Sequence, residues 1–224
     1  MNPVIDTLAA GDALSRETEM LAQVAATPEV RHLWLWQSPR ALVAPRKLSH
    51  KPEFAAAAEG LRADGWPVFL RATGGDVTPQ GPGVVNVTHV YAVPPTKAFD
   101  MQAEYDRLCR PIEAALGPGA SRGWQPGAFC DGAHNVQWAG RKFAGTAMRF
   151  RPCRIDKTRY AVLAHALMLF TPPKPDAIAA INRFLAAIEE DRVIRDDAHT
   201  GLPDGVSPKT FVDRLRAAFD AVVP

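Results

Sequence analysis

The chain has 224 residues, of which 47% are hydrophobic and 22% charged, with a formal net charge of +2. These values are ordinary for a globular protein, and the small net charge gives no broad electrostatic reason to expect nucleic-acid or membrane-surface binding. No apolar run approaches the ~20 residues of a membrane span, and the N-terminal residues do not resemble a secretion signal. Three cysteines in no metal-binding spacing indicate neither a zinc site nor a disulfide framework. We therefore expect a cytoplasmic protein without a bound metal.

Hydrophobic spacing predicts the elements of the first half of the chain. Apolar residues recur at helical intervals from residue 11 until Pro28 stops the pattern. RHLWLW (31–36) alternates like a strand, and ALVAP (41–45) indicates a second short one. An alanine-rich helix is expected over 51–65, followed by strands at 66–71 and 84–93, the latter rich in β-branched residues.

The second half of the chain has patterns that predict one helix, then three strands, then two helices. A helix is expected from about 100 to 116, then strands at 135–140, 141–151 and 160–170. An amphipathic pattern predicts a helix over 175–191, and Ser207 with Pro208 marks the start of a last helix. The proline-rich stretches VPPTK (93–97) and FTPPKP (170–175) are expected to be loops inside one domain. The order predicts a single α+β domain over residues 1–224, with a mixed β-sheet and helices packed mainly on one face.

Chemistry is concentrated first in LRATGGDVTPQGPGVVNVT (70–88). Its two adjacent glycines are costly to order, which suggests backbone that closely approaches a ligand. The strand–turn–strand setting differs from a phosphate loop, which needs a following helix. Exposed backbone N–H groups could still bind phosphate beside Arg71, and a tight structural turn explains the glycines equally well.

Two later segments add a lysine and a cysteine. In AGRKFAGTAMR (139–149), glycines on either side of Lys142 clear space around it, although a lysine on a strand is usually a solvated charge. GAFCDGAHNVQW (127–138) places Cys130 near His134 and Asn135, 12 residues before Lys142. A cysteine in such a loop is a candidate nucleophile if a nearby cation stabilises its thiolate.

Together these segments resemble the lipoate–protein ligase family, a branch of the biotin/lipoate ligase superfamily. The family's Arg-x-[Ser/Thr]-Gly-Gly element and following Asn-containing strand are matched by Arg71, Thr73, Gly74, Gly75 and Asn86. GRKFAGTA (140–147) matches its lysine element closely, LWLWQSPRALVAPRK resembles its early Trp-containing strand pair, and YAVLAHALML resembles a later strand carrying His165. The resemblance covers roughly residues 10–200.

The resemblance implies a biotin/lipoate ligase-like catalytic domain without a C-terminal accessory domain. The implied reaction activates lipoate or octanoate with ATP and Mg²⁺ to an acyl-adenylate and transfers the acyl group to a protein lysine. The implied partners are lipoyl-accepting domains of 2-oxoacid dehydrogenase complexes or the glycine cleavage H protein, with acyl carrier protein or an accessory protein as further possibilities. No permanently bound cofactor is implied.

The resemblance also assigns site residues. Lys142 would be catalytic, contacting the carbonyl and phosphate oxygens of the mixed anhydride. The adenylate would contact Arg71, Thr73, Gly74, Gly75, Asp76, Val77, Thr78, Pro79, Asn86 and Lys142. The acyl chain would lie along Asn135, Gly145, Thr146, Ala147 and His165, and burying a C8 chain is worth about 5 kcal/mol at ~0.8 kcal/mol per methylene.

Departures from the family pattern leave other functions open. Asp76 would repel a phosphate unless it turns away or meets a cation, and Gln80 and Gly81 replace the usual His-Asp pair. Some relatives with this fold are octanoyl transferases that take octanoate from acyl carrier protein as a cysteine thioester, and Cys130 lies at about that place. A non-catalytic acyl- or protein-binding relative, or a different acyl group such as biotin, completes the alternatives. His89 and His199 are interpreted as surface or core histidines, and Trp34, Trp36, Trp124 and Trp138 as core or tunnel wall.

Overall fold

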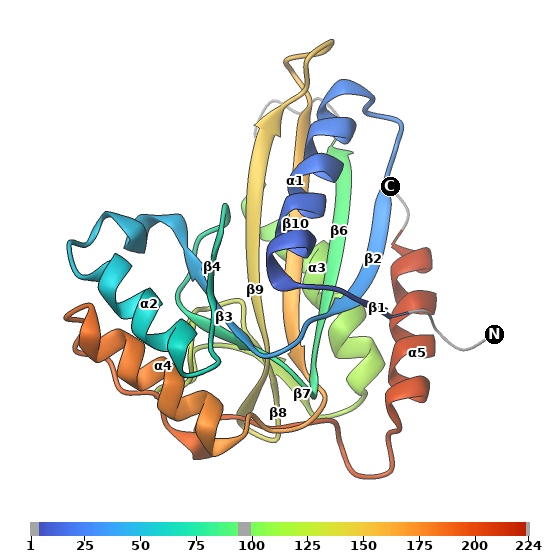
Figure 1. The fold of residues 1–224 in the computed structure, drawn as a ribbon. Coiled ribbons are helices and arrows are strands. Elements are labelled where there is room, and N and C mark those ends of the chain that lie inside the picture. Colours follow the sequence, from blue (N-terminus) through green and yellow to red (C-terminus); the bar gives the residue numbers. More distant parts are fainter. Residues whose placement is uncertain (1–4, 94–99, 223–224) are drawn as a thin grey trace.

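A computed structural model describes residues 5–93 and 100–222. Its elements are two β-sheets and five α-helices, arranged so that the smaller sheet faces part of the larger one (Figure 1). The expected proline-rich loop at 93–97 lies almost wholly outside the described residues. In the described part of the chain, no helix is long and apolar enough to cross a membrane.

The large sheet has the strand order β1-β2-β6-β10-β9-β8-β7. All neighbours in it are antiparallel except β1 and β2. Its strands are β1 (Asp6–Thr7), β2 (His32–Gln37), β6 (Val84–Val93), β7 (Ala120–Arg122), β8 (Val136–Trp138), β9 (Arg141–Pro152) and β10 (Tyr160–Leu169). The long central strands β6 and β10 are mostly buried, which explains their near-continuous runs of apolar residues.

The small sheet has the order β4-β3-β5 and carries the glycine-rich segment. Its strands are β3 (Ala41–Pro45), β4 (Val68–Arg71) and β5 (Thr78–Gln80). β3 is parallel to β4 and antiparallel to β5. The segment between β4 and β5, residues 72–77, is called the glycine turn below. β5 was expected to be part of the turn, because three residues carry too little periodicity to predict a strand.

The helices pack on both faces of the large sheet and on the small sheet. They are α1 (Ala10–Ala26), α2 (Phe54–Ala63), α3 (Met101–Leu116), α4 (Pro175–Ala187) and α5 (Pro208–Ala221), with 3₁₀ turns η1 (Arg46–His50) and η2 (Asp196–Ala198). α3 and α5 share one apolar core with one face of the large sheet, and α1 packs on the opposite face. α2 and α4 form a second core with the small sheet.

Helix termini follow the signals in the sequence. The Asp100 side chain accepts hydrogen bonds from Gln102 N and Ala103 N at the start of α3, and Ser207 accepts from Thr210 N at the start of α5. The expected α+β class with mixed β-structure is confirmed, while the helices divide between both faces of the large sheet. Trp34 and Trp36 are buried as expected, but Trp124 is 64% exposed because it lies in the loop after β7, so its assignment to the core was wrong.

Candidate active site

A cavity lies between the two sheets, where the small sheet and α1 face the middle of the large sheet. Its empty volume is about 430 Å³, part of which opens to solvent. We call it the inner cavity; it is lined by Leu14, Trp36, Val43, Arg71, Thr78, Gln80, Asn86, Cys130, Gly145, Thr146, Ala147, His165 and Leu167. Along the strand order it crosses from β9 through β10 and β6 to β2. Its lining is mostly apolar with a few polar groups, which is the usual character of a small-molecule pocket.

Cys130 lies where this cavity meets the surface. Two surface clefts also reach it, one lined by Tyr105 and His134 and the other by Lys47 and Arg192. Its backbone has φ of 48°, a left-handed conformation that is rare for a residue other than glycine and is often associated with functional sites. Its Sγ accepts a hydrogen bond from Asp76 N at 3.3 Å. The thiol therefore has access, a donor beside it, and a backbone held in an unusual conformation.

Lys142 holds the backbone that carries this thiol. Its side chain is fully buried, and Nζ donates to Phe129 O at 2.5 Å and to Cys130 O at 2.8 Å. Burial lowers the pKa of Lys142 to about 8, against the opposing effect of Cys130 and Asp131. A Cβ at Gly145 would lie 3.0 Å from Nζ, so the glycine after the lysine makes room for this buried cation.

His199 binds the backbone N–H of Phe129, the residue whose carbonyl accepts from Lys142. Phe129 N donates to His199 Nε2 at 3.2 Å, which assigns the ring hydrogen to Nδ1 and its donation to Arg195 O at 3.1 Å. The imidazole stacks on the Phe129 ring at 4.4 Å between centroids. Burial, together with the Lys142 charge, lowers the pKa of His199 to about 4, so the ring is neutral near pH 7. His199 is thus a core histidine, as expected, but one that positions the residue before Cys130.

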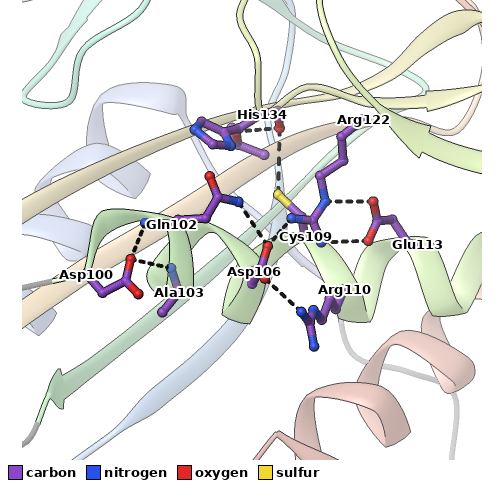
Figure 2. Close-up of polar contacts among 10 residues, drawn as sticks. Asp100, Gln102, Ala103, Asp106, Cys109, Arg110, Glu113, Arg122 and His134 are labelled. Carbon is purple, nitrogen blue, oxygen red and sulfur yellow. Dashed lines mark hydrogen bonds and ion pairs between the residues drawn. The ribbon is translucent and has the colours of Figure 1, made fainter.

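The loop bearing Cys130, residues 123–135, is anchored at its base by α3. Arg122 at the end of β7 is paired with Glu113 at 2.6 and 2.7 Å and also with Asp106, both on α3 (Figure 2). Cys109 Sγ lies 3.6 Å from His134 O, and Thr146 Oγ1 donates to the same oxygen. Asn135 donates to Asp131 Oδ1 at 3.4 Å and borders the surface cleft beside Tyr105. Asn135, expected in the acyl pocket, does not line the inner cavity itself, but it is buried and its Oδ1 would lie 3.8 Å from a Cβ at Gly145, which does.

Arg71 organises the glycine turn from inside. Its guanidinium is 5% exposed and donates to Val43 O, Gly74 O and Asp76 O, the last at 2.6 Å. Burial lowers the pKa of Arg71, and the negative groups around it, Cys130 first, oppose that shift. Gly75 has φ of 94°, and a Cβ there would lie 2.6 Å from Cys130 Sγ. Gly75 is therefore required both for the turn and for the close approach of the thiol.

The other residues assigned to adenylate binding have different surroundings. The Asp76 carboxylate pairs with Arg192, so its charge does meet a cation. Val77 is 1% exposed in the apolar core, and Pro79 is part of β5. Thr78 and Asn86 line the inner cavity, where Asn86 exchanges two hydrogen bonds with Gln80, at 2.9 and 3.2 Å.

Thr73 and His165 are joined to a residue that the sequence did not single out. Thr73 Oγ1 lies 2.9 Å from His165 Nε2, and His165 Nδ1 lies 3.1 Å from both oxygens of Glu17. Gly145, Thr146 and Ala147 line the cavity beside His165, as expected of an acyl pocket. Glu17 lies between Leu14 and Met20 on the apolar face of α1. A charged residue on an apolar face was the sequence feature that could have identified it.

Metal-ligating residues are not grouped in this site. Across residues 5–93 and 100–222, no cluster of three or more His, Cys, Asp or Glu side chains could hold a metal ion.

A family model, the lipoyl protein ligase A/B catalytic domain, matches residues 9–220. The chain belongs to this family. It is 39% identical over 201 residues to an uncharacterized protein of Cupriavidus necator, covering 82% of this chain and 77% of the relative. It is 32% identical over 209 residues to an octanoyl-[GcvH]:protein N-octanoyltransferase of Kyrpidia tusciae, covering 85% of this chain and 67% of the relative.

Solved structures of the lipoyl protein ligase family share the fold. A crystal structure of lipoate-protein ligase A bound with ATP matches with a TM-score of 0.66 at 16% identity, covering 98% of this chain and 83% of that one. A protein of Thermoplasma acidophilum with bound lipoic acid matches with a TM-score of 0.64 at 17% identity, covering 99% and 85%. The biotin/lipoate ligase-like fold expected from the sequence is therefore confirmed.

Proposed function

We propose that this chain transfers an octanoyl group to a lysine of a lipoyl-accepting protein through a thioester on Cys130. The observation that carries the proposal is the position of the Cys130 thiol at the mouth of the inner cavity, with a backbone N–H from the glycine turn 3.3 Å from sulfur. An acyl chain bound to this sulfur could enter the apolar cavity directly. The proposal takes the second of the two enzymatic functions left open by the sequence.

The surroundings of Cys130 suit a nucleophile. Two buried basic side chains lie beside it: Lys142 Nζ donates to Cys130 O at 2.8 Å, and both Arg71 Nη2 and Cys130 Sγ border the Cβ position of Gly75. In the first step the thiolate attacks the octanoyl carbonyl, a sulfur–carbon bond forms, and the donor leaves with the electrons of its own bond. In the second step the acceptor lysine attacks, a nitrogen–carbon bond forms, and the electrons of the thioester bond return to Cys130.

The same geometry gives less support to nucleotide binding. The Arg71 guanidinium, expected to clamp a phosphate, is engaged by three carbonyl oxygens. Asp76 adds a carboxylate at the same turn. The Kyrpidia tusciae relative is named as a transferase, which supports the choice of reaction.

ATP-dependent ligation of lipoate or octanoate is the second candidate. The observation that favours it is the ion pair between Asp76 and Arg192, since a neutralised carboxylate repels a phosphate less. The ligase A structure with this fold was solved with ATP, and Mg²⁺ would then enter with the nucleotide as a substrate.

The proposed partners are an octanoyl-carrying protein as donor and a lipoyl domain as acceptor. The name of one relative gives octanoyl-[GcvH] as its donor, and the Thermoplasma structure was studied with an E2 lipoyl domain. Acyl carrier protein with an octanoyl thioester is the other donor to test.

Intact-mass spectrometry of a lipoyl domain tests the proposal in three parallel reactions. The first contains octanoyl acyl carrier protein, the second octanoyl H protein, and the third lipoate with ATP and Mg²⁺. We expect an octanoyl mass gain in the first or second without ATP. A mass gain confined to the third would show a ligase and contradict the transferase proposal.

Cysteine variants provide the matched control for these reactions. Cys130→Ala should abolish transfer, because the thioester cannot form. Cys153→Ala removes a thiol that is 1% exposed in the core beside α1, and it should leave transfer within about twofold of wild type. Normal activity in Cys130→Ala would exclude the thioester mechanism.

A further inference from the structure

Three side chains beside the inner cavity form a connected carboxylate–imidazole–hydroxyl chain. Glu17 comes from α1, His165 from β10 and Thr73 from the glycine turn. The chain runs from Glu17 to His165 Nδ1 at 3.1 Å and from His165 Nε2 to Thr73 Oγ1 at 2.9 Å. We call it the Glu17 relay.

The hydrogen positions in the relay follow from its partners. Thr88 Oγ1 donates to Glu17 at 2.6 Å, and Trp36 Nε1 donates to Thr88 at 3.0 Å. Burial acts to raise the pKa of Glu17, but His165 and these donors outweigh it, so the pKa is lowered and the group is a carboxylate near pH 7. A carboxylate only accepts hydrogen bonds, so His165 carries a hydrogen on Nδ1, and in the neutral imidazole Nε2 is then the acceptor for the Thr73 hydroxyl.

The relay meets the site of the proposed chemistry at His165. His165 lines the same cavity as Cys130. Thr73 is two residues before Gly75, which directly abuts the Cys130 thiol. A separate cleft lined by Glu17 and Thr73 reaches the relay from the α1 side. Glu17 is only 2% exposed, and its carboxylate is held by hydrogen bonds from Thr88 on β6 and His165 on β10. An apolar residue would fit the core at this point of α1, so packing alone does not require a carboxylate here.

We propose that His165, oriented by Glu17 and acting through the Thr73 hydroxyl, accepts the proton released when the acceptor lysine attacks the octanoyl thioester. The proposal rests on the transferase function given above. His165 and Thr73 are the catalytic residues of this step, and Glu17 is a positioning residue.

The step is balanced in atoms and electrons. The lysine nitrogen bonds to the thioester carbonyl carbon, and the carbon–sulfur electrons return to Cys130 as a thiolate. The proton lost by nitrogen passes to the Thr73 oxygen as the hydroxyl proton moves to His165 Nε2. The resulting imidazolium is stabilised by the Glu17 carboxylate. General-base assistance of this kind contributes about 100-fold or more to a rate.

Other charged groups lie near His165. Arg71 on β4 and Cys130 line the same cavity, and Arg46 and Glu19 border the cleft on the α1 side. Arg149 on β9 donates to Ala72 O at the edge of the glycine turn. These groups are unchanged in the variants below, so comparison with wild type removes their contribution.

The test separates the two half-reactions in the full chain. Octanoyl-enzyme is formed with the octanoyl donor and measured by intact mass, then mixed with a lipoyl domain at several pH values. Measured per octanoyl-enzyme actually formed, we expect His165→Gln and Glu17→Gln to transfer the acyl group about 100-fold more slowly near pH 7. The deficit should shrink as pH rises, because hydroxide can then take the proton that nitrogen loses in place of His165.

Hydroxylamine distinguishes a chemical role from a structural one. Its nitrogen is far less basic than a lysine amine, so the adduct loses its proton to water without a positioned base, and attack on the thioester should be nearly as fast in His165→Gln as in wild type. Thr73→Val should slow transfer to the lipoyl domain, and Thr73→Ser, which keeps a hydroxyl, should transfer faster than Thr73→Val. His50→Gln, on the exposed turn η1, is the histidine control and should match wild type.

The outcomes separate this inference from the transferase proposal. If wild-type enzyme acquires no octanoyl group from either donor, the result contradicts the transferase proposal and, with it, the proposed role of the Glu17 relay. Octanoyl-enzyme that forms in wild type and transfers at equal rates in wild type, His165→Gln and Glu17→Gln overturns the relay alone. Equal losses with lysine and hydroxylamine would assign these residues a structural role and also overturn it.

Discussion

At the scale of single residues, the site depends on how closely the glycine turn approaches Cys130. Gly75→Ala would place a methyl group 2.6 Å from Sγ and 2.9 Å from Arg71 Nη2, in a left-handed conformation. We expect it to destabilise the fold by about 1–3 kcal/mol and to abolish acyl transfer. Gly74→Ala adds the same methyl into open space, and its effect should be much smaller. Urea unfolding and the transfer assay compare them; equal effects would contradict the close approach.

Lys142 gives a pH-dependent prediction. Its folded-state pKa of about 8 lies below its ordinary value of 10.5, so between these values the unfolded chain binds more protons. Raising the pH through this window therefore favours the folded state, and below about pH 8 the full cost of burying the charge is present. Wild type should gain stability relative to Lys142→Met between about pH 7 and pH 10, measured by urea unfolding. A stability difference that does not change with pH would show that burial does not lower the pKa of Lys142.

The sequence singled out residues by motif, whereas the structure shows their contacts. Cys130 and His165 line the inner cavity, Thr73 is hydrogen-bonded to His165, and Lys142 donates to the backbone of Cys130. Glu17 and His199 were not selected, because their partners are 148 and 70 residues away and no local pattern joins them. The sequence predicts that Lys142 faces the ligand, whereas in the structure its ammonium donates to two carbonyl oxygens. No local sequence pattern indicates this contact.

At the scale of elements, ion pairs between Arg122, at the end of β7, and two carboxylates of α3 hold the base of the Cys130 loop. Arg122 is largely buried between Glu113 and Asp106 (Figure 2), and these partners raise its pKa against the effect of burial. Arg122→Gln should destabilise the protein by about 2 kcal/mol, because it leaves the partly buried Glu113 carboxylate without its partner, while Asp106 keeps Arg110. It should also increase hydrogen exchange in residues 123–135.

Arg110 is the matched control, because it pairs with the same Asp106 but its side chain is 72% exposed. Arg110→Gln should change stability by less than about 1 kcal/mol. Similar losses in the two variants would show that Arg122 is an ordinary surface ion pair.

Element prediction succeeded where periodicity was long. The strands β6, β9 and β10 and the helices α1 and α3 follow their patterns closely. β5 and β7 have three residues each and were not predicted, because their strand conformation is set by pairing with β3 and β8.

At the scale of the whole molecule, the fold creates the site by facing one sheet against another. The small sheet supplies Arg71 and Thr78, the large sheet supplies Asn86 and His165, and the cavity lies between them. The sequence identified most of the strands but not that β3, β4 and β5 form a separate sheet, since strand order depends on long-range pairing. The family resemblance supplied the fold that periodicity alone could not.

The most direct test of the account is to locate the acyl group on the enzyme itself. The chain is mixed with octanoyl donor in the absence of acceptor, quenched in acid, digested and analysed by tandem mass spectrometry. The account predicts an octanoyl thioester on Cys130 that hydroxylamine removes and that disappears when a lipoyl domain is added. An unmodified Cys130 in a preparation that still octanoylates the lipoyl domain would contradict it.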